Sequence, residues 1–356
     1  MINTQTMRLS RLYGLRDLRV EEGPIPHPGP GEVLLKIASV GTCGSDVHYY
    51  VEGAIGDQVV TDPIQMGHEF SAWVAGLGPG VTDLELGELV AVEPAISCGV
   101  CESCQHGHPN LCPNVRFCGT PPIDGVFAEY AVMPAENCFV LPEGFSPDEG
   151  ALLEPLGIGI HTVDLSHLKV GETVAVFGAG PVGLLVAACA RIAGAAEVYM
   201  TEPLASRRAF ALEYCADAAY NPDEEDVVEA IMTATSGRGV DVAFEAAGAP
   251  DTPDQAARVA RPGGTVVVAG IPVEDHMVMT ASQIRRKGLT IKMVRRMKHT
   301  YPRAIRMVAY GMIDIAALAT HRFPLDRIAE AFELVANYRD GVLRAMIEIG
   351  TEAPQA

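Results

Sequence analysis

The pattern of hydrophobic and polar positions changes near residue 170 and divides the chain into two kinds of sequence. From about residue 7 to 150, short apolar runs such as 33–37 and 89–92 lie between glycine and proline residues. Short runs bounded in this way predict strands, so we expect this part to be β-rich. The proline-rich segment 24–31 predicts a rigid surface turn within it.

From residue 171 onward, predicted strands and helices alternate. The strands are expected at 173–177, 197–201, 240–245 and 265–269, with helices such as 182–193 and 203–215 between them. Alternation of this kind builds a parallel, doubly wound sheet. The last part of the chain predicts helices at 304–308 and 325–338 and a strand at 344–349. We expect that final strand to return to the first, β-rich part.

Composition indicates the number of domains and excludes two classes of partner. The chain has 356 residues, which exceeds one ordinary hydrophobic core and predicts two domains. The formal net charge is −19, so we expect neither nucleic acid nor an anionic membrane surface as partner. One basic cluster lies within residues 285–298. It predicts either a solvated face or subunit contact, or a local site for an anion or a polar substrate.

The chain contains nine cysteines, and they are bunched rather than spread in pairs. No apolar run approaches the roughly 18 residues that a membrane helix needs. The first residues also lack the basic-then-apolar pattern of a signal peptide, so we expect a cytoplasmic protein. In that reducing compartment, bunched cysteines favour metal binding over disulfides.

A glycine-rich loop follows the predicted strand 173–177 and precedes a predicted helix. Its residues are Gly178, Ala179, Gly180, Pro181, Val182 and Gly183. The glycines allow a tight turn and close approach of a pyrophosphate, and the helix offers free N–H groups to the phosphates. Glu202, at the end of the next predicted strand, is placed to accept hydrogen bonds from a ribose 2′-OH, which favours NAD over NADP. Arg207 and Arg208 lie nearby and could soften that preference, or they are simply exposed helix residues.

Four cysteines with short spacing form the strongest metal motif in the chain. They are Cys98, Cys101, Cys104 and Cys112. Four thiolates close a tetrahedral zinc shell without a vacancy, so the motif predicts a structural zinc site. Two disulfides are the alternative, which a reducing compartment disfavours.

A second predicted zinc site combines three different ligand types. Cys43, His68 and Glu69 offer sulfur, nitrogen and oxygen, and three ligands with one open position are typical of catalytic zinc. An open position lets the metal lower the pKa of a substrate hydroxyl. Taken alone, the same residues also fit a buried thiol with two surface polar residues, so the interpretation depends on the rest of the chain.

The order of these motifs along nearly the whole chain resembles the zinc-dependent medium-chain alcohol dehydrogenases. Within that family, the chain is most similar to the sorbitol and xylitol (polyol) dehydrogenases. The segments that carry the resemblance are 42–50, 67–69, 98–112, 117–122, 149–156, 178–183 and 320–325. The resemblance implies a β-rich, GroES-like catalytic domain at 1–156 and 295–356 and a Rossmann domain at 157–294. It also implies two zinc ions per chain, one catalytic and one structural, with NAD as cofactor.

The resemblance further implies roles for the residues around the predicted catalytic zinc. Glu154 is expected close to the metal and its water, and Asp46 is expected to orient the ligand His68. Ser45 and His48 match a relay that carries the alcohol proton to solvent. The polyol pocket is expected to be lined by Tyr49, Phe117 and Arg296.

The implied reaction oxidises a secondary hydroxyl of a xylitol- or sorbitol-like polyol to the ketose and forms NADH, in a homotetramer or homodimer. Met297 stands where sorbitol dehydrogenases often carry an aromatic residue, which leaves the accepted chain length open. L-threonine and 2,3-butanediol dehydrogenases are alternatives, although threonine dehydrogenases tend to carry Asp-Pro-Phe in place of residues 154–156. A cofactor-binding protein without activity, of the crystallin kind, usually loses the zinc ligands, and this chain has them all.

Overall fold

The computed structural model describes residues 6–350, 352 and 353, which form two compact units. The second unit is Pro155–Thr300, and the first comprises the described residues on either side of it. The sequence placed these boundaries at 156/157 and 294/295. Among the described residues, no helix combines the length and the apolar character that crossing a membrane requires.

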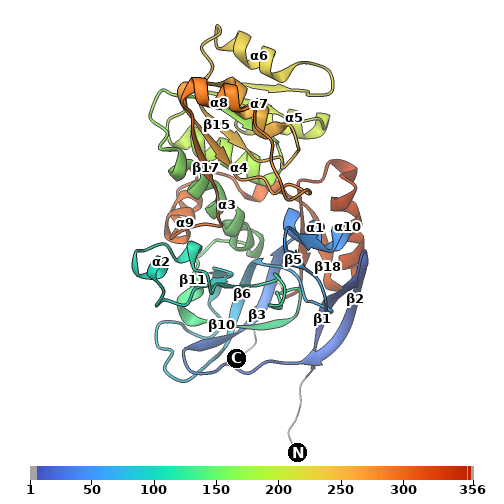
Figure 1. Ribbon diagram of the computed structural model, residues 1–356. Coiled ribbons are helices and arrows are strands. Elements are labelled where there is room, and N and C mark those ends of the chain that lie inside the picture. The colour runs from blue at the N-terminus through green and yellow to red at the C-terminus, as the bar shows by residue number, and fades with distance from the viewer. Residues whose placement is uncertain (1–5, 351, 354–356) are drawn as a thin grey trace, which may run out of the picture. The chain divides into compact units, whose positions relative to one another are not determined.

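The first unit is built on a seven-stranded sheet (Figure 1). Its order is β11-β7-β6-β3-β19-β18, and β10 also pairs with β3. The strands are β3 (Glu32–Gly41), β6 (Glu69–Leu77), β7 (Leu89–Val92), β10 (Tyr130–Pro134), β11 (Cys138–Val140), β18 (Ala319–Pro324) and β19 (Arg344–Glu348). Strand β19 pairs antiparallel with β3, with Met346 opposite Gly41. The predicted return of the last strand to the β-rich part is therefore confirmed.

Shorter elements complete the first unit. They are β1 (Thr6–Gly14), β2 (Asp17–Pro24), α1 (Gly44–Glu52), β4 (Ala54–Ile55), β5 (Gln58–Val59), β8 (Ala95–Ile96), α2 (Glu102–Gln105), β9 (Arg116–Phe117), α9 (Tyr301–Ala309) and α10 (Ile328–Ala336). Strands β1 and β2 form an antiparallel hairpin. Figure 1 shows α10, drawn in red, beside α1, drawn in blue, and the Tyr50 hydroxyl of α1 donates to the Glu333 carboxylate of α10 at 2.9 Å. This contact ties α10 to the helix that follows β3.

The second unit contains a six-stranded parallel sheet in the order β14-β13-β12-β15-β16-β17. The strands are β12 (Thr173–Phe177), β13 (Glu197–Thr201), β14 (Ala218–Tyr220), β15 (Val240–Glu245), β16 (Ala260–Val268) and β17 (Thr290–Met293). The helices are α4 (Pro181–Ile192), α5 (Ala205–Tyr214), α6 (Val227–Ala234), α7 (Thr252–Val259) and α8 (Ala281–Lys287). The strand order reverses between β12 and β15, which is the switch point of a doubly wound sheet. The predicted parallel sheet is confirmed, with the strands at 173–177, 197–201 and 240–245 as expected.

Two helices near the predicted zinc site were not anticipated from the pattern. Helix α1 buries one face made of Asp46, Tyr49 and Tyr50, and these polar side chains stand where an apolar stripe would have predicted a helix. Helix α3 (Pro147–Ser166) contains Pro155, which normally argues against a helix interior. Its apolar residues surround the whole helix rather than one face, so its sequence gives no periodic signal.

Candidate active site and metal centres

The predicted catalytic zinc ligands converge at one end of the β3–β6 strand pair. Cys43 lies between β3 and α1, directly before the helix, whereas His68 directly precedes β6 and Glu69 is the first residue of that strand. Because Gly41 of β3 pairs with Glu69 of β6, the three residues are brought together by the register of the sheet. Their ligand atoms all lie within 4.8 Å of one another, and His68 and Glu69 are buried. This mixture of sulfur, nitrogen and oxygen donors fits zinc with one position left for substrate.

Asp46 connects two of these ligands through its carboxylate. Its Oδ2 accepts a hydrogen bond from the Cys43 amide at 3.0 Å, and its Oδ1 lies 3.5 Å from His68 Nδ1. Oδ1 also accepts from the Gly67 amide at 3.2 Å. A carboxylate on Nδ1 selects the tautomer that leaves Nε2 for a metal. Asp46 is fully buried, so this arrangement is held in a dry environment.

The protonation of His68 depends on the same neighbours. Burial alone lowers the pKa of His68, but the Asp46 carboxylate and the Cys43 thiol outweigh it and raise that pKa well above its usual value. A metal that binds the imidazole must therefore displace a proton.

Ser45 and His48, the two residues of the predicted proton relay, both lie on α1. The Ser45 hydroxyl is 3.4 Å from His68 Nε2, which places it beside the metal-binding nitrogen. His48 is half-buried, and burial lowers the pKa of its imidazole while Glu52 opposes that shift. A neutral imidazole near neutral pH can accept a proton.

Two buried ionisable residues complete the surroundings of Glu69. Burial, helped by the Glu69 carboxylate, raises the pKa of Glu154 to about 8. Arg344 of β19 is 3% exposed, and its Nη2 lies 3.2 Å from Glu69 Oε1. Arg344 also donates to the Thr42 carbonyl oxygen. The sequence did not predict a role for Arg344, because its partners Thr42 and Glu69 lie far from it along the chain.

The three predicted polyol-pocket residues have different environments. The Phe117 ring lies against the His68 imidazole, with ring centroids 5.2 Å apart. Tyr49 is buried in the hydrophobic core of the first unit, and its hydroxyl donates to Gln58 Oε1 at 3.4 Å. Arg296 belongs to the second unit and has a left-handed backbone with φ of 53°.

Met297, the neighbour of Arg296, is buried in the second unit against α3. A Cβ added at Gly157 would lie 2.3 Å from the Met297 Sδ atom. The thioether therefore occupies the space that the missing side chain of Gly157 leaves.

The four clustered cysteines form a compact lobe around α2. Cys101 Sγ lies 3.4 Å from Cys104 Sγ and 3.8 Å from Cys112 Sγ, and Cys112 Sγ lies 3.5 Å from Cys98 Sγ. All four are free thiols. With Zn–S bonds of about 2.3 Å, the edges of a tetrahedral zinc site are about 3.8 Å long, so these separations suit one zinc ion. Backbone N–H groups of Val100 and Cys101 lower the pKa of Cys98 to about 6, which favours the thiolate that a metal needs.

The glycine loop follows β12 and leads into α4, with Gly180 at the helix N-cap and Pro181 at its first position. A Cβ at Gly183 would lie 2.0 Å from the Gly178 carbonyl oxygen, so only glycine permits this packing of helix on strand. Gly178 has a φ of 98°, which forms the tight turn. The free amides at the start of α4 and the absence of side chains fit a pyrophosphate.

The acidic residue after β13 reaches back to this loop. Glu202 is 5% exposed, and its carboxylate accepts hydrogen bonds from the Ala179 amide at 2.9 Å and the Leu204 amide at 3.1 Å. Of the two alternatives for Arg207, an exposed helix residue is wrong, because Arg207 is buried with its Nη1 beside Gly180. Arg208 instead donates to the Glu202 carbonyl oxygen at 2.8 Å. Arg207 therefore belongs to the surroundings of the glycine loop.

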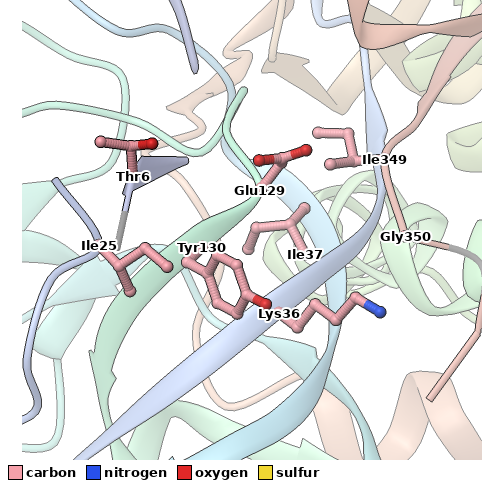
Figure 2. Close-up of a pocket in the computed structure, with 8 residues that line it drawn as sticks. All are labelled: Thr6, Ile25, Lys36, Ile37, Glu129, Tyr130, Ile349 and Gly350. Carbon is pink, nitrogen blue, oxygen red and sulfur yellow. The ribbon is translucent and has the colours of Figure 1, made fainter. Parts of the chain in front are cut away.

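The first unit also has a pocket of about 430 Å³ away from these residues (Figure 2). Its lining residues are Thr6, Ile25, Lys36, Ile37, Glu129, Tyr130, Ile349 and Gly350. None of them belongs to the predicted sites. The Glu129 carboxylate is already bonded to Arg8, at 2.9 Å from Arg8 Nε. The predicted chemistry therefore lies elsewhere.

Comparisons with known proteins agree with the fold and the sites. A family model described as alcohol dehydrogenase GroES-like domain matches residues 29–143, and one described as zinc-binding dehydrogenase matches 181–310. Sorbitol dehydrogenase of Bacillus subtilis (strain 168) is 37% identical over 343 residues, which cover 96% of this chain and 97% of that protein. A protein named Probable D-xylulose reductase A, from Aspergillus clavatus, is 39% identical and covers 91% of this chain and 92% of its own length.

Solved structures show the same architecture. The structure of 2R,3R-butanediol dehydrogenase from Bacillus subtilis matches with a TM-score of 0.85 and 32% identity, covering 96% of this chain and 99% of that one. The fold, the two metal-binding clusters and the glycine loop together define a zinc-binding dehydrogenase with a GroES-like domain. The chain belongs to the zinc-dependent medium-chain alcohol dehydrogenase family.

Proposed function

We propose that this protein is a zinc- and NAD-dependent polyol dehydrogenase that oxidises a secondary hydroxyl of a xylitol- or sorbitol-like sugar alcohol to the ketose. The observation that carries the proposal is the cluster of Cys43, His68 and Glu69, which brings three zinc-binding side chains together within the described part of the chain. The matches to sorbitol dehydrogenase and D-xylulose reductase support a polyol as the substrate.

Different residues position the zinc ligands and transfer the alcohol proton. When bound, zinc supplies a Lewis acid that favours loss of the proton from an alcohol, and NAD accepts the hydride. Asp46 holds His68 in the orientation and tautomer that ligation requires. The Ser45 hydroxyl, beside His68, accepts the alcohol proton and passes it to His48, whose half-buried imidazole delivers it to solvent.

Glu154 and the pocket residues orient the substrate. The buried Glu154 carboxyl, close to Glu69, can accept hydrogen bonds from two neighbouring hydroxyls of a polyol through its two oxygens. The Phe117 ring forms an apolar wall beside His68. Recognition of adjacent hydroxyls separates a polyol from a simple alcohol, because unpaired buried polar groups disfavour the analogue that lacks them.

The test is the rate of NADH formation with xylitol, sorbitol, other pentitols and hexitols, L-threonine and 2,3-butanediol at equal concentrations. A preference for one polyol, measured as kcat/KM, supports the proposal. Turnover of threonine or the diol alone would replace the polyol by that substrate and leave the zinc and cofactor assignments standing. Butanediol belongs in the panel because of the structural match to a butanediol dehydrogenase.

We also propose that the enzyme is a cytoplasmic homotetramer or homodimer. The four cysteines of the lobe cluster in a way that suits one metal ion rather than disulfides, which supports a reducing compartment. Analytical ultracentrifugation of the zinc-loaded protein measures the mass of the assembly, and a monomeric mass would contradict this part of the proposal.

A further inference from the structure

Glu245, the last residue of β15, is a buried carboxylate with an unusual set of partners. It is 1% exposed, and its Oε1 accepts hydrogen bonds from the Ala247 amide at 2.9 Å, the Gly248 amide at 2.8 Å and the Thr252 hydroxyl at 2.9 Å. Within the part of the chain that the structure describes, its Oε2 is buried and has no hydrogen-bond partner. One oxygen therefore organises the segment that follows β15.

Residues 246–248, which follow β15, pack against the start of the glycine loop. The Ala246 amide donates to the Phe177 carbonyl oxygen at 2.9 Å, directly before the loop begins. A Cβ added at Gly178 would lie 3.0 Å from the backbone of Ala247. The position of residues 246–248 therefore determines where the tight turn at Gly178 can lie.

On its other side, Glu245 contacts the segment that follows β16. The Ala269 and Gly270 amides donate to the Glu245 carbonyl oxygen at 2.7 and 3.0 Å. A Cβ at Gly270 would lie only 2.4 Å from Glu245 Oε2, and a Cβ at Gly248 would lie 2.4 Å from the Ile271 carbonyl oxygen. Three chain segments, after β12, β15 and β16, therefore pack backbone against backbone around one carboxylate.

These segments lie at the carboxyl ends of neighbouring parallel strands, at the point where the strand order reverses. Dinucleotides bind outside this edge of a doubly wound sheet. We propose that Glu245 is a positioning residue for the dinucleotide, because its carboxylate fixes the loops that must meet the pyrophosphate and the nicotinamide half. The inference rests on the proposed use of NAD and adds a residue to that site.

The two oxygens of Glu245 matter as much as its shape. A carboxylate can accept hydrogen bonds through both oxygens, whereas a carboxamide accepts through only one. Glutamine keeps an acceptor oxygen but replaces Oε2 by an NH2 group, which would point into a dry space beside Gly270. Glu245→Gln is therefore expected to loosen the loops without removing volume.

Asp241 provides a matched control on the same strand. It is also buried, and it accepts hydrogen bonds from the Thr173 amide at 3.0 Å and from Arg238 at 2.6 Å. Thr173 begins β12, so Asp241 organises the opposite end of the sheet. Asp241→Asn should destabilise the second unit without reaching the glycine loop.

The experiment titrates the zinc-loaded, full-length proteins with NADH, followed by fluorescence, and records thermal unfolding of each variant. Glu245→Gln should raise the NADH Kd by about tenfold or more. Asp241→Asn should lower the unfolding temperature and leave the Kd within about twofold of wild type. Thr252→Val removes one hydrogen-bond donor to Glu245 and should raise the NADH Kd by less. This variant replaces Glu245→Gln in the test if Glu245→Gln does not fold.

A wild-type Kd in Glu245→Gln, or in Thr252→Val where that variant replaces it, would overturn the inference. An equal loss of NADH affinity in Asp241→Asn would also overturn it, because general destabilisation would then account for the effect. A wild-type protein that binds NADH and oxidises no polyol would refute the proposed function and leave the role of Glu245 intact.

Discussion

At the scale of single residues, the site depends on buried charges that hold one another in place. Asp46 joins the Cys43 amide to the His68 imidazole, and Arg344 lies 3.2 Å from Glu69. None of these charges is in contact with bulk water, so each depends on its partner for stabilisation. Replacing one partner therefore affects the zinc ligands even where it does not bind metal itself.

Asp46→Asn should weaken catalytic zinc binding by about 10–100-fold, because the amide no longer holds the His68 tautomer. Competition with a chromophoric chelator measures the affinity, and the lobe cysteines should keep their own zinc. Asp57→Asn, at an exposed loop position, is the matched control. Unchanged zinc affinity in Asp46→Asn would contradict the role of Asp46.

At the scale of elements, two turns carry metal or cofactor sites whose geometry depends on small or sulfur-bearing residues. The lobe around α2 brings four thiols together over residues 98–112. The turn between β12 and α4 brings Gly183 against Gly178. Each of these two segments is short, so a single substitution can abolish its binding site without altering the rest of its unit.

The two zinc sites should be lost independently. Cys43→Ser and Cys104→Ser should each leave one zinc per chain. Cys43→Ser should abolish turnover, whereas Cys104→Ser should mainly lower the unfolding temperature. Elemental analysis against protein concentration gives the stoichiometry for both variants. Two zinc ions retained in either variant would show that its cysteine is not a ligand.

Gly183→Ala should weaken NADH binding and destabilise the second unit by about 1–3 kcal/mol, because its Cβ would overlap the Gly178 carbonyl oxygen. Urea unfolding and NADH titration measure the two effects. Gly14→Ala, where a Cβ meets no atom within 4 Å, controls for the loss of glycine flexibility. Wild-type NADH affinity in Gly183→Ala would argue against close packing at this turn.

The sequence predicted those features that depend on residues close together in the chain or on a regular apolar pattern. The strands at 173–177, 197–201 and 240–245 were predicted because apolar runs and turns alternate there. Arg344 was missed because its partner Thr42 lies 302 positions away. Helix α3 was missed because burial on all sides removes the helical period from its sequence. Long-range pairing and complete burial leave no local signal.

At the scale of the whole molecule, the protein carries a net charge of −19, and folding holds some carboxylates ionised more strongly than in an unfolded chain. Asp241 is the clearest case. Burial alone raises the pKa of Asp241, but hydrogen bonds from Arg238, the Thr173 amide and Arg261 outweigh it and hold that pKa well below its usual range. A carboxylate with a lowered pKa stabilises the fold above its unfolded pKa, and this contribution is lost as the pH falls.

Asp241→Asn should therefore cost about 1–2 kcal/mol of unfolding free energy at pH 7, because the partly exposed Arg238 and Arg261 lose a charged acceptor but remain solvated. The difference from wild type should shrink below about pH 4, where the unfolded carboxyl takes up a proton. Urea unfolding at pH 7, 5 and 3 measures the difference. A gap that stays constant with pH would show that the charge of Asp241 contributes nothing.

The pairing of β19 with β3 has a consequence for how the protein is made. The second unit is one continuous stretch, so it can finish folding while the ribosome is still adding the last residues. The first unit must wait for residues 344–348, which supply both the missing strand and the Arg344 guanidinium beside Glu69. The zinc-binding unit is started first and completed last, so a nascent chain acquires its dinucleotide site before its metal site is finished.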